Sequence, residues 1–161
     1  PGFAMAVLRY FNVAGCSFGL RERHDPETHL IPIILQAASG QRSHVAIFGT
    51  DYDTPDGTCI RDYVHVEDLV EAHAVVLDAL QPGDRRVYNV GSGRGWSVRE
   101  VMDKAREVTG IDFDVREGER RAGDPAVLVT SPDKLASELG WRTSRSSIEN
   151  ILATHWAATP H

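Results

Sequence analysis

Residues 57–69 read GTCIRDYVHVEDL and join a short strand directly to a helix. The run 60–65 is rich in β-branched and aromatic residues, as strands are, and from Glu67 onward apolar residues recur at helical spacing. Arg61 places a fixed positive charge inside the strand, and its planar guanidinium is suited to bind a phosphate or a carboxylate through two donors at once. The simpler interpretation of the same residues is an ion pair between Arg61 and Asp62.

Strands and helices alternate along the rest of the chain. Hydrophobic patterning predicts strands over 4–11, 45–48, 60–65, 86–90 and 113–115, and helices over 29–39, 67–80 and after Ser97, Ser131 and Ser146. Ser97 and Ser146 are each followed by a glutamate three residues later, which is the spacing of a capping box. The helix over 67–80 is expected to turn one apolar face inward, made of Leu69, His73, Val76, Leu77 and Leu80. This alternation predicts a single α/β domain over residues 1–161.

The composition argues against two classes of partner. The chain has 161 residues, a formal net charge of −6 and 42% hydrophobic residues, which is ordinary for one globular domain. An acidic balance argues against a nucleic-acid partner, and no apolar run is long enough to span a membrane. Cys16 and Cys59 form no CxxC pair and are expected to be free thiols in a reducing cytoplasm.

The glycine-rich loop 91–95 invites a dinucleotide-binding interpretation, because it follows a strand and precedes a helix. That fingerprint needs a third small residue where the helix packs against the strand. The register from Gly91 and Gly93 places Trp96 at this position, and an indole cannot make that close approach. A strand-to-helix turn before a capped helix is therefore the favoured interpretation.

No motif in the chain predicts a metal site or a catalytic nucleophile. The acidic loop 51–57 has its glycine one place too late for a calcium loop, and Asp62 stands where the bidentate glutamate belongs. The seven histidines form no HExxH motif, His73 is expected to be a core residue, and no GxSxG is present. No tyrosine is followed by a lysine at the fourth position, so the Tyr-x-x-x-Lys base of hydride chemistry is absent.

Six blocks of sequence carry a specific resemblance. They are LRYFNVAG (8–15), HLIP (29–32), AIFGTDYDTPDGTCIRDYVHVEDL (46–69), VYNVGSGRGWSV (87–98), RRAGDP (120–125) and LGWR (139–142). In order and spacing these blocks resemble the carboxyl-terminal half of the UDP-glucose 4-epimerases, a family within the extended short-chain dehydrogenase/reductase superfamily. The resemblance runs from end to end of the chain. It implies the substrate-binding part of an extended Rossmann fold, together with the late strands of its sheet.

The resemblance also implies an NAD-dependent isomerase of galactose metabolism. In that family bound NAD takes a hydride from C4 of the hexose, and the hydride returns to the other face of a 4-keto intermediate. The glycine-rich NAD loop and the Tyr-x-x-x-Lys base belong to the amino-terminal half, which this chain lacks. The chain alone is therefore expected to be inactive, and the complete protein is expected to be a cytoplasmic homodimer. Phe11 would contact the nicotinamide end of NAD.

Positions that match the family's motifs imply a site for UDP-glucose or UDP-galactose. Arg61 and Arg121 would hold the diphosphate, and Asp124 would accept ribose hydroxyl groups, since an ionised carboxylate accepts two donors at once. Leu128 falls where side-chain bulk helps to admit or exclude N-acetylhexosamines. Around the uracil, a strand would present its backbone and an aromatic face. The remaining implied substrate contacts are Asn12, His29, Leu30, Ala46, Ile47 and Phe48. The residues 46–48 are those implied around the uracil. His29 stands where the family more often has asparagine.

Two alternatives remain open at this point. The chain could belong to another NAD-dependent sugar-nucleotide epimerase, acting on UDP-N-acetylglucosamine or on a uronate. It could also be a non-catalytic nucleotide-sugar binding module. Without its partner half, the chain is also expected to expose apolar surface along the strand at residues 5–11, which invites self-association.

Overall fold

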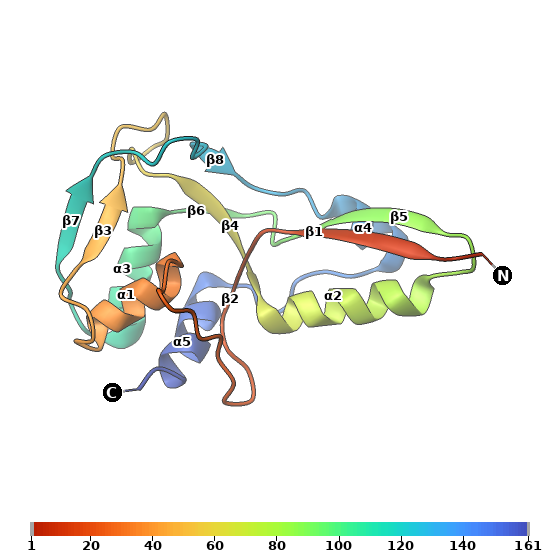
Figure 1. The fold of residues 1–161 in the computed structure, drawn as a ribbon, viewed down its shortest axis with the longest axis horizontal. Coiled ribbons are helices and arrows are strands. Elements are labelled where there is room, and N and C mark those ends of the chain that lie inside the picture. Colours follow the sequence, from red (N-terminus) through yellow and green to blue (C-terminus); the bar gives the residue numbers. More distant parts are fainter. Residues whose placement is uncertain (1, 161) are drawn as a thin grey trace.

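Strands and helices of the chain form two groups joined by a central strand. The computed structural model describes residues 2–160. Figure 1 shows β1, β5, α2 and α4 gathered at one end of the molecule and β3, β7, α1, α3 and α5 at the other. Strand β4 (Ile60–His65) runs between the two groups. The fold is α/β with several parallel strand pairs, as the sequence predicts.

The first group is a parallel strand pair covered by helices on one face only. β1 (Met5–Tyr10) pairs with β5 (Arg85–Val90), and α2 (Val66–Ala79) packs against them together with α4 (Asp133–Leu139). The residues buried in this cluster are Ala72, Val76, Tyr88, Val90, Leu135 and Trp141. Side chains alternate along a strand, so the other face keeps apolar residues exposed: Met5, Val7 and Val87 are 39%, 40% and 38% exposed. The expected exposure of apolar surface along the first strand is confirmed.

β4 is the centre of a mixed sheet. The half of β4 that ends at His65 pairs in parallel with β2 (Asn12–Ala14). The half that begins at Ile60 pairs with β6 (Gly95–Ser97) in the antiparallel sense and with β8 (Val127–Leu128) in parallel. This strand therefore brings together segments from the beginning, the middle and the later part of the chain.

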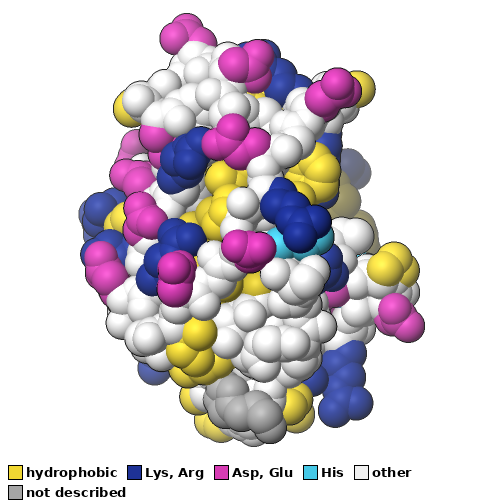
Figure 2. Space-filling model, turned by 90° about the vertical axis from the view of Figure 1, so that its left-hand side faces the viewer, with side chains coloured by type: hydrophobic (Ala, Val, Ile, Leu, Met, Phe, Trp, Pro, Cys, Tyr) yellow, Lys and Arg dark blue, Asp and Glu magenta, His cyan; other side chains and the backbone are white. Residues whose placement is uncertain are grey.

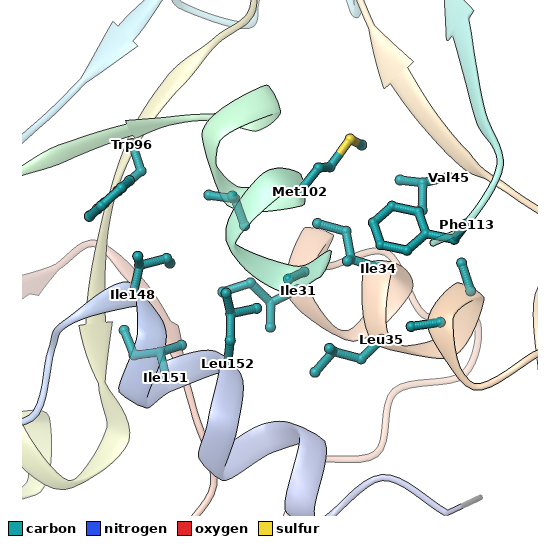
Figure 3. Close-up of a cluster of buried hydrophobic side chains, with 14 of the residues drawn as sticks. Ile31, Ile34, Leu35, Val45, Trp96, Met102, Phe113, Ile148, Ile151 and Leu152 are labelled. Carbon is teal, nitrogen blue, oxygen red and sulfur yellow. The ribbon is translucent and has the colours of Figure 1, made fainter. Parts of the chain in front are cut away.

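The second group is a two-stranded parallel sheet packed against three helices. Its strands are β3 (Val45–Phe48) and β7 (Val115–Gly118), and its helices are α1 (Leu30–Ala38), α3 (Val98–Thr109) and α5 (Ile148–Ala157). Figure 3 shows side chains of these helices and of β3 meeting in a common core, together with one residue of β6 and one that precedes β7. The labelled members are Ile31, Ile34, Leu35, Val45, Trp96, Met102, Phe113, Ile148, Ile151 and Leu152.

One of the two predicted capping boxes is confirmed, and the other is wrong by one residue. At α3, the Ser97 side chain accepts from the Glu100 amide, and the Glu100 carboxylate accepts from the Ser97 amide. At α5 the cap is Ser147. Ser146 is used elsewhere: its hydroxyl donates to the buried Asp68 carboxylate at 2.5 Å. A long-range partner has taken the side chain that the local pattern assigned to the cap.

The prediction of the inward face of α2 is also wrong in part. His73 is exposed, as is Leu77 at 69%, whereas the buried residues of the helix are Asp68, Ala72 and Val76. Asp68 explains the rotation of the helix. Its carboxylate accepts hydrogen bonds from the backbone N–H groups of the turn at residues 144–145. Because Asp68 must face these donors, the opposite face of the helix, which carries Leu77, points outward.

The end of the molecule that carries β3 and β7 has a surface with charges of both signs. Figure 2 shows acidic and basic side chains interspersed on that face, with small apolar patches between them. Among residues 2–160, no helix combines the length and the apolar character that a membrane crossing requires.

Candidate functional site

A cleft of about 1180 Å³ is lined by residues from both groups of elements. Nine of the residues implied by the resemblance line it: Phe11, Asn12, His29, Leu30, Ala46, Phe48, Arg61, Arg121 and Asp124. Two do not. Ile47 is 1% exposed and belongs to the core behind β3. Leu128 lies in β8 as the register partner of Arg61 and is 44% exposed, outside the cleft lining.

Arg61 and Asp124 form an ion pair on the wall of the cleft. Arg61 Nη2 lies 2.6 Å from Asp124 Oδ1, and Arg61 Nη1 donates to the Ile60 carbonyl at 2.8 Å. The side chains are only 13% and 34% exposed, so water screens this pair less than it screens a surface pair. The ion pair between Arg61 and Asp62 considered above is wrong, because adjacent side chains of a strand point to opposite faces.

Arg121 and Phe48 form a second contact in the cleft. The guanidinium carbon of Arg121 lies 4.0 Å from the centroid of the Phe48 ring, which is a cation–π contact. Ala46 and Phe48 both line the cleft from β3, while Ile47 between them points into the core. Within residues 2–160, β3 pairs with β7 alone, so the second edge of β3 offers main-chain donors and acceptors to a ligand.

Asn12 at the cleft and the buried Asp62 both hold β4 in place. The Asn12 amide Nδ2 donates to the Asp62 carbonyl at 2.8 Å. The Asp62 side chain is fully buried and turns away from Arg61 toward the glycine loop. Its carboxylate accepts four hydrogen bonds, at 2.9, 2.6, 3.0 and 3.2 Å, from Ser92 N, Ser92 Oγ, Gly93 N and Thr130 N. One face of β4 is thereby anchored, and the other holds Arg61 at the cleft.

The segment 15–29 forms part of the cleft rim. His29 precedes α1, and its Nδ1 lies 2.8 Å from Glu27 Oε1. Leu30 is the first residue of α1. Burial raises the pKa of the Cys16 thiol near the start of the segment, so Cys16 has the neutral character of a structural cysteine and not that of an activated nucleophile.

The chain matches the model of the NAD dependent epimerase/dehydratase family over residues 1–91. It belongs to this family. Residues 1–91 include β1, β4 and α2, and therefore the strand that carries Arg61.

Curated relatives within the epimerase/dehydratase family extend the match to nearly the whole chain. The chain is 46% identical over 158 residues to the UDP-glucose 4-epimerase of Corynebacterium glutamicum. This match covers 98% of the chain and 48% of that protein. It is also 46% identical to the UDP-glucose 4-epimerase of Lacticaseibacillus casei, over 96% of the chain and 48% of that protein. The chain thus spans about half the length of the curated relatives it matches.

Solved structures show the same fold. The UDP-glucose 4-epimerase of Bifidobacterium longum in complex with NAD⁺ and UDP is 35% identical and superposes with a TM-score of 0.91 over 97% of the chain and 47% of that structure. The enzyme of Brucella ovis in complex with NAD is 42% identical, with a TM-score of 0.83 over 94% of the chain and 48% of that structure.

The glycine loop of this family member lacks the free donors that a pyrophosphate requires. The N–H groups of Ser92 and Gly93 already donate to Asp62, and a Cβ at Gly91 would lie 2.7 Å from Asp62 Oδ2. The glycines therefore allow close packing on a buried carboxylate, which agrees with the turn interpretation. Phe11, for which the resemblance implies a contact with NAD, lines the cleft just after β1.

The sequence interpretation missed several charged residues at the cleft, among them three that lie near the start of α2 and the turn before α5. Glu67 and Glu71 line it from α2, and Arg145 reaches it from the turn before α5. Arg145 Nε lies 2.7 Å from Glu67 Oε2, and the Ser17 hydroxyl donates to Glu67 Oε1 at 2.6 Å. The spacing of Glu67 and Glu71 could have marked one face of the helix, but no local signal connects Arg145 to it.

Proposed function

We propose that this chain forms the UDP-sugar-binding part of an NAD-dependent UDP-glucose 4-epimerase, which interconverts UDP-glucose and UDP-galactose through a 4-keto intermediate. The observation that carries the proposal is the presence of Arg61, Arg121 and Asp124 in one cleft, beside the open edge of β3. Two guanidinium groups suit a diphosphate, and a carboxylate suits a ribose diol. The complete protein is proposed to be a homodimer in the cytoplasm.

In the proposed mechanism this chain binds and orients the substrate. Arg61 donates to the diphosphate from a position fixed by β4, and Arg121 approaches from the loop after β7. Asp124 then accepts from the ribose hydroxyls with the carboxylate oxygen that Arg61 leaves free. Phe48 offers its ring to the uracil, and the open edge of β3 offers main-chain hydrogen bonds. Each charge-assisted bond contributes about 1.5–3 kcal/mol to binding.

NAD, when bound to the complete protein, supplies the hydride acceptor for C4 of the hexose. Phe11 would lie at the nicotinamide end and exclude water from it. Asn12, whose amide is fixed by its bond to the Asp62 carbonyl, would hold the sugar nucleotide next to it. The proton-transfer base is proposed to lie outside this chain, because none of its tyrosines has the Tyr-x-x-x-Lys spacing.

The isolated 161-residue chain is expected to lack epimerase activity while retaining measurable affinity for UDP. Conversion of UDP-galactose is followed by enzymatic detection of UDP-glucose with added NAD, and UDP binding is followed by titration calorimetry. Binding without turnover is the expected result, because the substrate contacts are in the chain and the base is not. Robust turnover by the chain alone would contradict the assignment of the base. Absence of UDP binding by the folded chain would contradict the assignment of the cleft.

Leu128→Ala in the complete protein is expected to raise turnover of UDP-N-acetylglucosamine relative to UDP-glucose by about tenfold, the effect of a modest change in pocket size. The measurement is the ratio of kcat/KM for the two substrates. Val127→Ala is the matched control, because Val127 is the neighbouring residue of β8 and is also exposed, at 51%. An unchanged ratio for Leu128→Ala would remove Leu128 from the site.

A further inference from the structure

A group of metal-ligating side chains lies on the segment 15–29, apart from the diphosphate residues. One ligand atom from each of Glu22, His24 and His29 lies within 4.8 Å of the others. His24 Nδ1 and Glu22 Oε1 are already 3.2 Å apart. The two imidazole rings meet edge to face, with centroids 5.0 Å apart and planes at 83°. The histidines are five residues apart and follow no metal-binding motif, so the conformation of the segment brings them together.

Glu27 holds one of these imidazoles in the orientation that a metal ligand needs. Its Oε1 lies 2.8 Å from His29 Nδ1 and also accepts from the backbone N–H groups of Thr28 and His29, at 2.9 and 2.8 Å. The Glu27 side chain is only 10% exposed. A carboxylate fixed on Nδ1 places the ring proton there and leaves the Nε2 lone pair free, which is the usual outer contact of a histidine that binds a metal.

A buried histidine shares a small cavity with two of the three side chains. His155, on α5, is 8% exposed, and its Nδ1 has no hydrogen-bond partner among the described residues. His155 lines a small cavity of about 110 Å³ together with Glu22, His24 and Glu27. A buried polar atom without a partner is costly, and a cavity of this size has room for water. The cavity therefore gives room for water beside Glu22 and His24.

We infer that Glu22, His24 and His29 bind one divalent transition-metal ion of the Zn²⁺ type, with water as the fourth ligand. Two imidazoles and one carboxylate are a common ligand set for Zn²⁺. Tetrahedral bonds of about 2.0–2.2 Å place ligand atoms about 3.4 Å apart. The three exposed side chains, whose ligand atoms lie within 4.8 Å of one another, would rotate toward one another to reach this spacing. Since Glu22 and His29 also line the large cleft, the ion would fix the rim of the cleft at this point.

The test is titration of the chelator-treated protein with Zn²⁺ by calorimetry, and with Co²⁺ by visible absorption. One site per chain with tetrahedral Co²⁺ bands is expected. His24→Ala and Glu22→Gln are each expected to weaken Zn²⁺ binding by more than 100-fold, since each removes a ligand. Glu27→Gln is expected to weaken it by about 10- to 100-fold, the effect of losing an outer contact.

His73→Ala is the matched control, because His73 is an exposed histidine on α2 outside this group. It is expected to bind Zn²⁺ as the unaltered protein does. Equal losses in His73→Ala and His24→Ala would overturn the proposal, as would full binding by the His24→Ala and Glu22→Gln variants. The absence of a one-to-one site in the folded, unaltered protein would overturn it as well. His24, Glu22 and Glu27 are not among the implied substrate contacts, so loss of Zn²⁺ binding in their variants is distinguishable from loss of UDP binding.

Discussion

Asp62→Ala is expected to lower the free energy of unfolding by about 3–5 kcal/mol, which is at the upper end of single substitutions. The carboxylate is fully buried and accepts four hydrogen bonds. Its removal leaves donors of Ser92, Gly93 and Thr130 inside the protein without an acceptor, and each such group costs about 1–3 kcal/mol. Urea unfolding followed by circular dichroism measures the change.

Two controls separate this effect from a general effect of charge. Asp62→Asn keeps one acceptor oxygen and is expected to lose less stability than Asp62→Ala. Asp53→Ala removes an exposed carboxylate from the loop before β4 and is expected to change stability by no more than about 0.5 kcal/mol. A loss below about 1 kcal/mol in Asp62→Ala would show that the glycine loop finds other partners, for example water.

The same carboxylate illustrates which parts of the fold could be predicted from the sequence. The bounds of β3 and β4 were predicted correctly, because short β-branched and apolar runs bounded by polar loops are a local signal. The start of α3 was predicted from Ser97 for the same reason. The partners of Asp62 lie at residues 92–93 and 130, which no local pattern connects to it.

Long-range contacts also account for the errors. Ser146 has the spacing of a cap but donates to Asp68, far along the chain, so the cap of α5 moves to Ser147. Leu77 fits the apolar face of a helix, yet the buried Asp68 sets the rotation of α2 and leaves Leu77 exposed. In both cases a buried carboxylate that must be satisfied outweighs a local preference.

The candidate site was predictable in its residues but not in its contacts. The blocks that carry the family resemblance contain all nine of the predicted residues that line the cleft. The pairing of Arg61 with Asp124, and of Arg121 with Phe48, depends on how β4, β8 and β3 are arranged. The segment 15–29 has no periodic pattern, so neither its conformation nor the meeting of His24 and His29 could be foreseen.

Arg61→Ala is expected to weaken UDP binding by about 10- to 100-fold, since a charge-assisted hydrogen bond is worth about 1.5–3 kcal/mol and 1.4 kcal/mol is tenfold. The substitution removes a diphosphate donor and also leaves Asp124 without its 2.6 Å partner at the cleft wall. An unpaired carboxylate beside the diphosphate would repel it, which adds to the loss. Titration calorimetry of UDP measures the effect in the isolated chain, and kcat/KM measures it in the complete protein.

The matched control for Arg61→Ala is Arg99→Ala, which breaks an ion pair of the same kind with Glu117 at 2.6 Å, but on the surface, where the two side chains are 41% and 58% exposed. It is expected to leave UDP affinity unchanged. Arg61→Lys keeps the charge but cannot donate to the diphosphate and to Asp124 with the planar geometry of a guanidinium. The UDP affinity of Arg61→Lys is therefore expected to lie between the affinities of Arg61→Ala and Arg99→Ala. The double substitution Arg61→Ala with Asp124→Asn separates repulsion from loss of the donor. Partial recovery of affinity would show that repulsion by Asp124 contributes, whereas equal affinity in Arg61→Ala, Arg99→Ala and the unaltered chain would show that the diphosphate does not bind at β4.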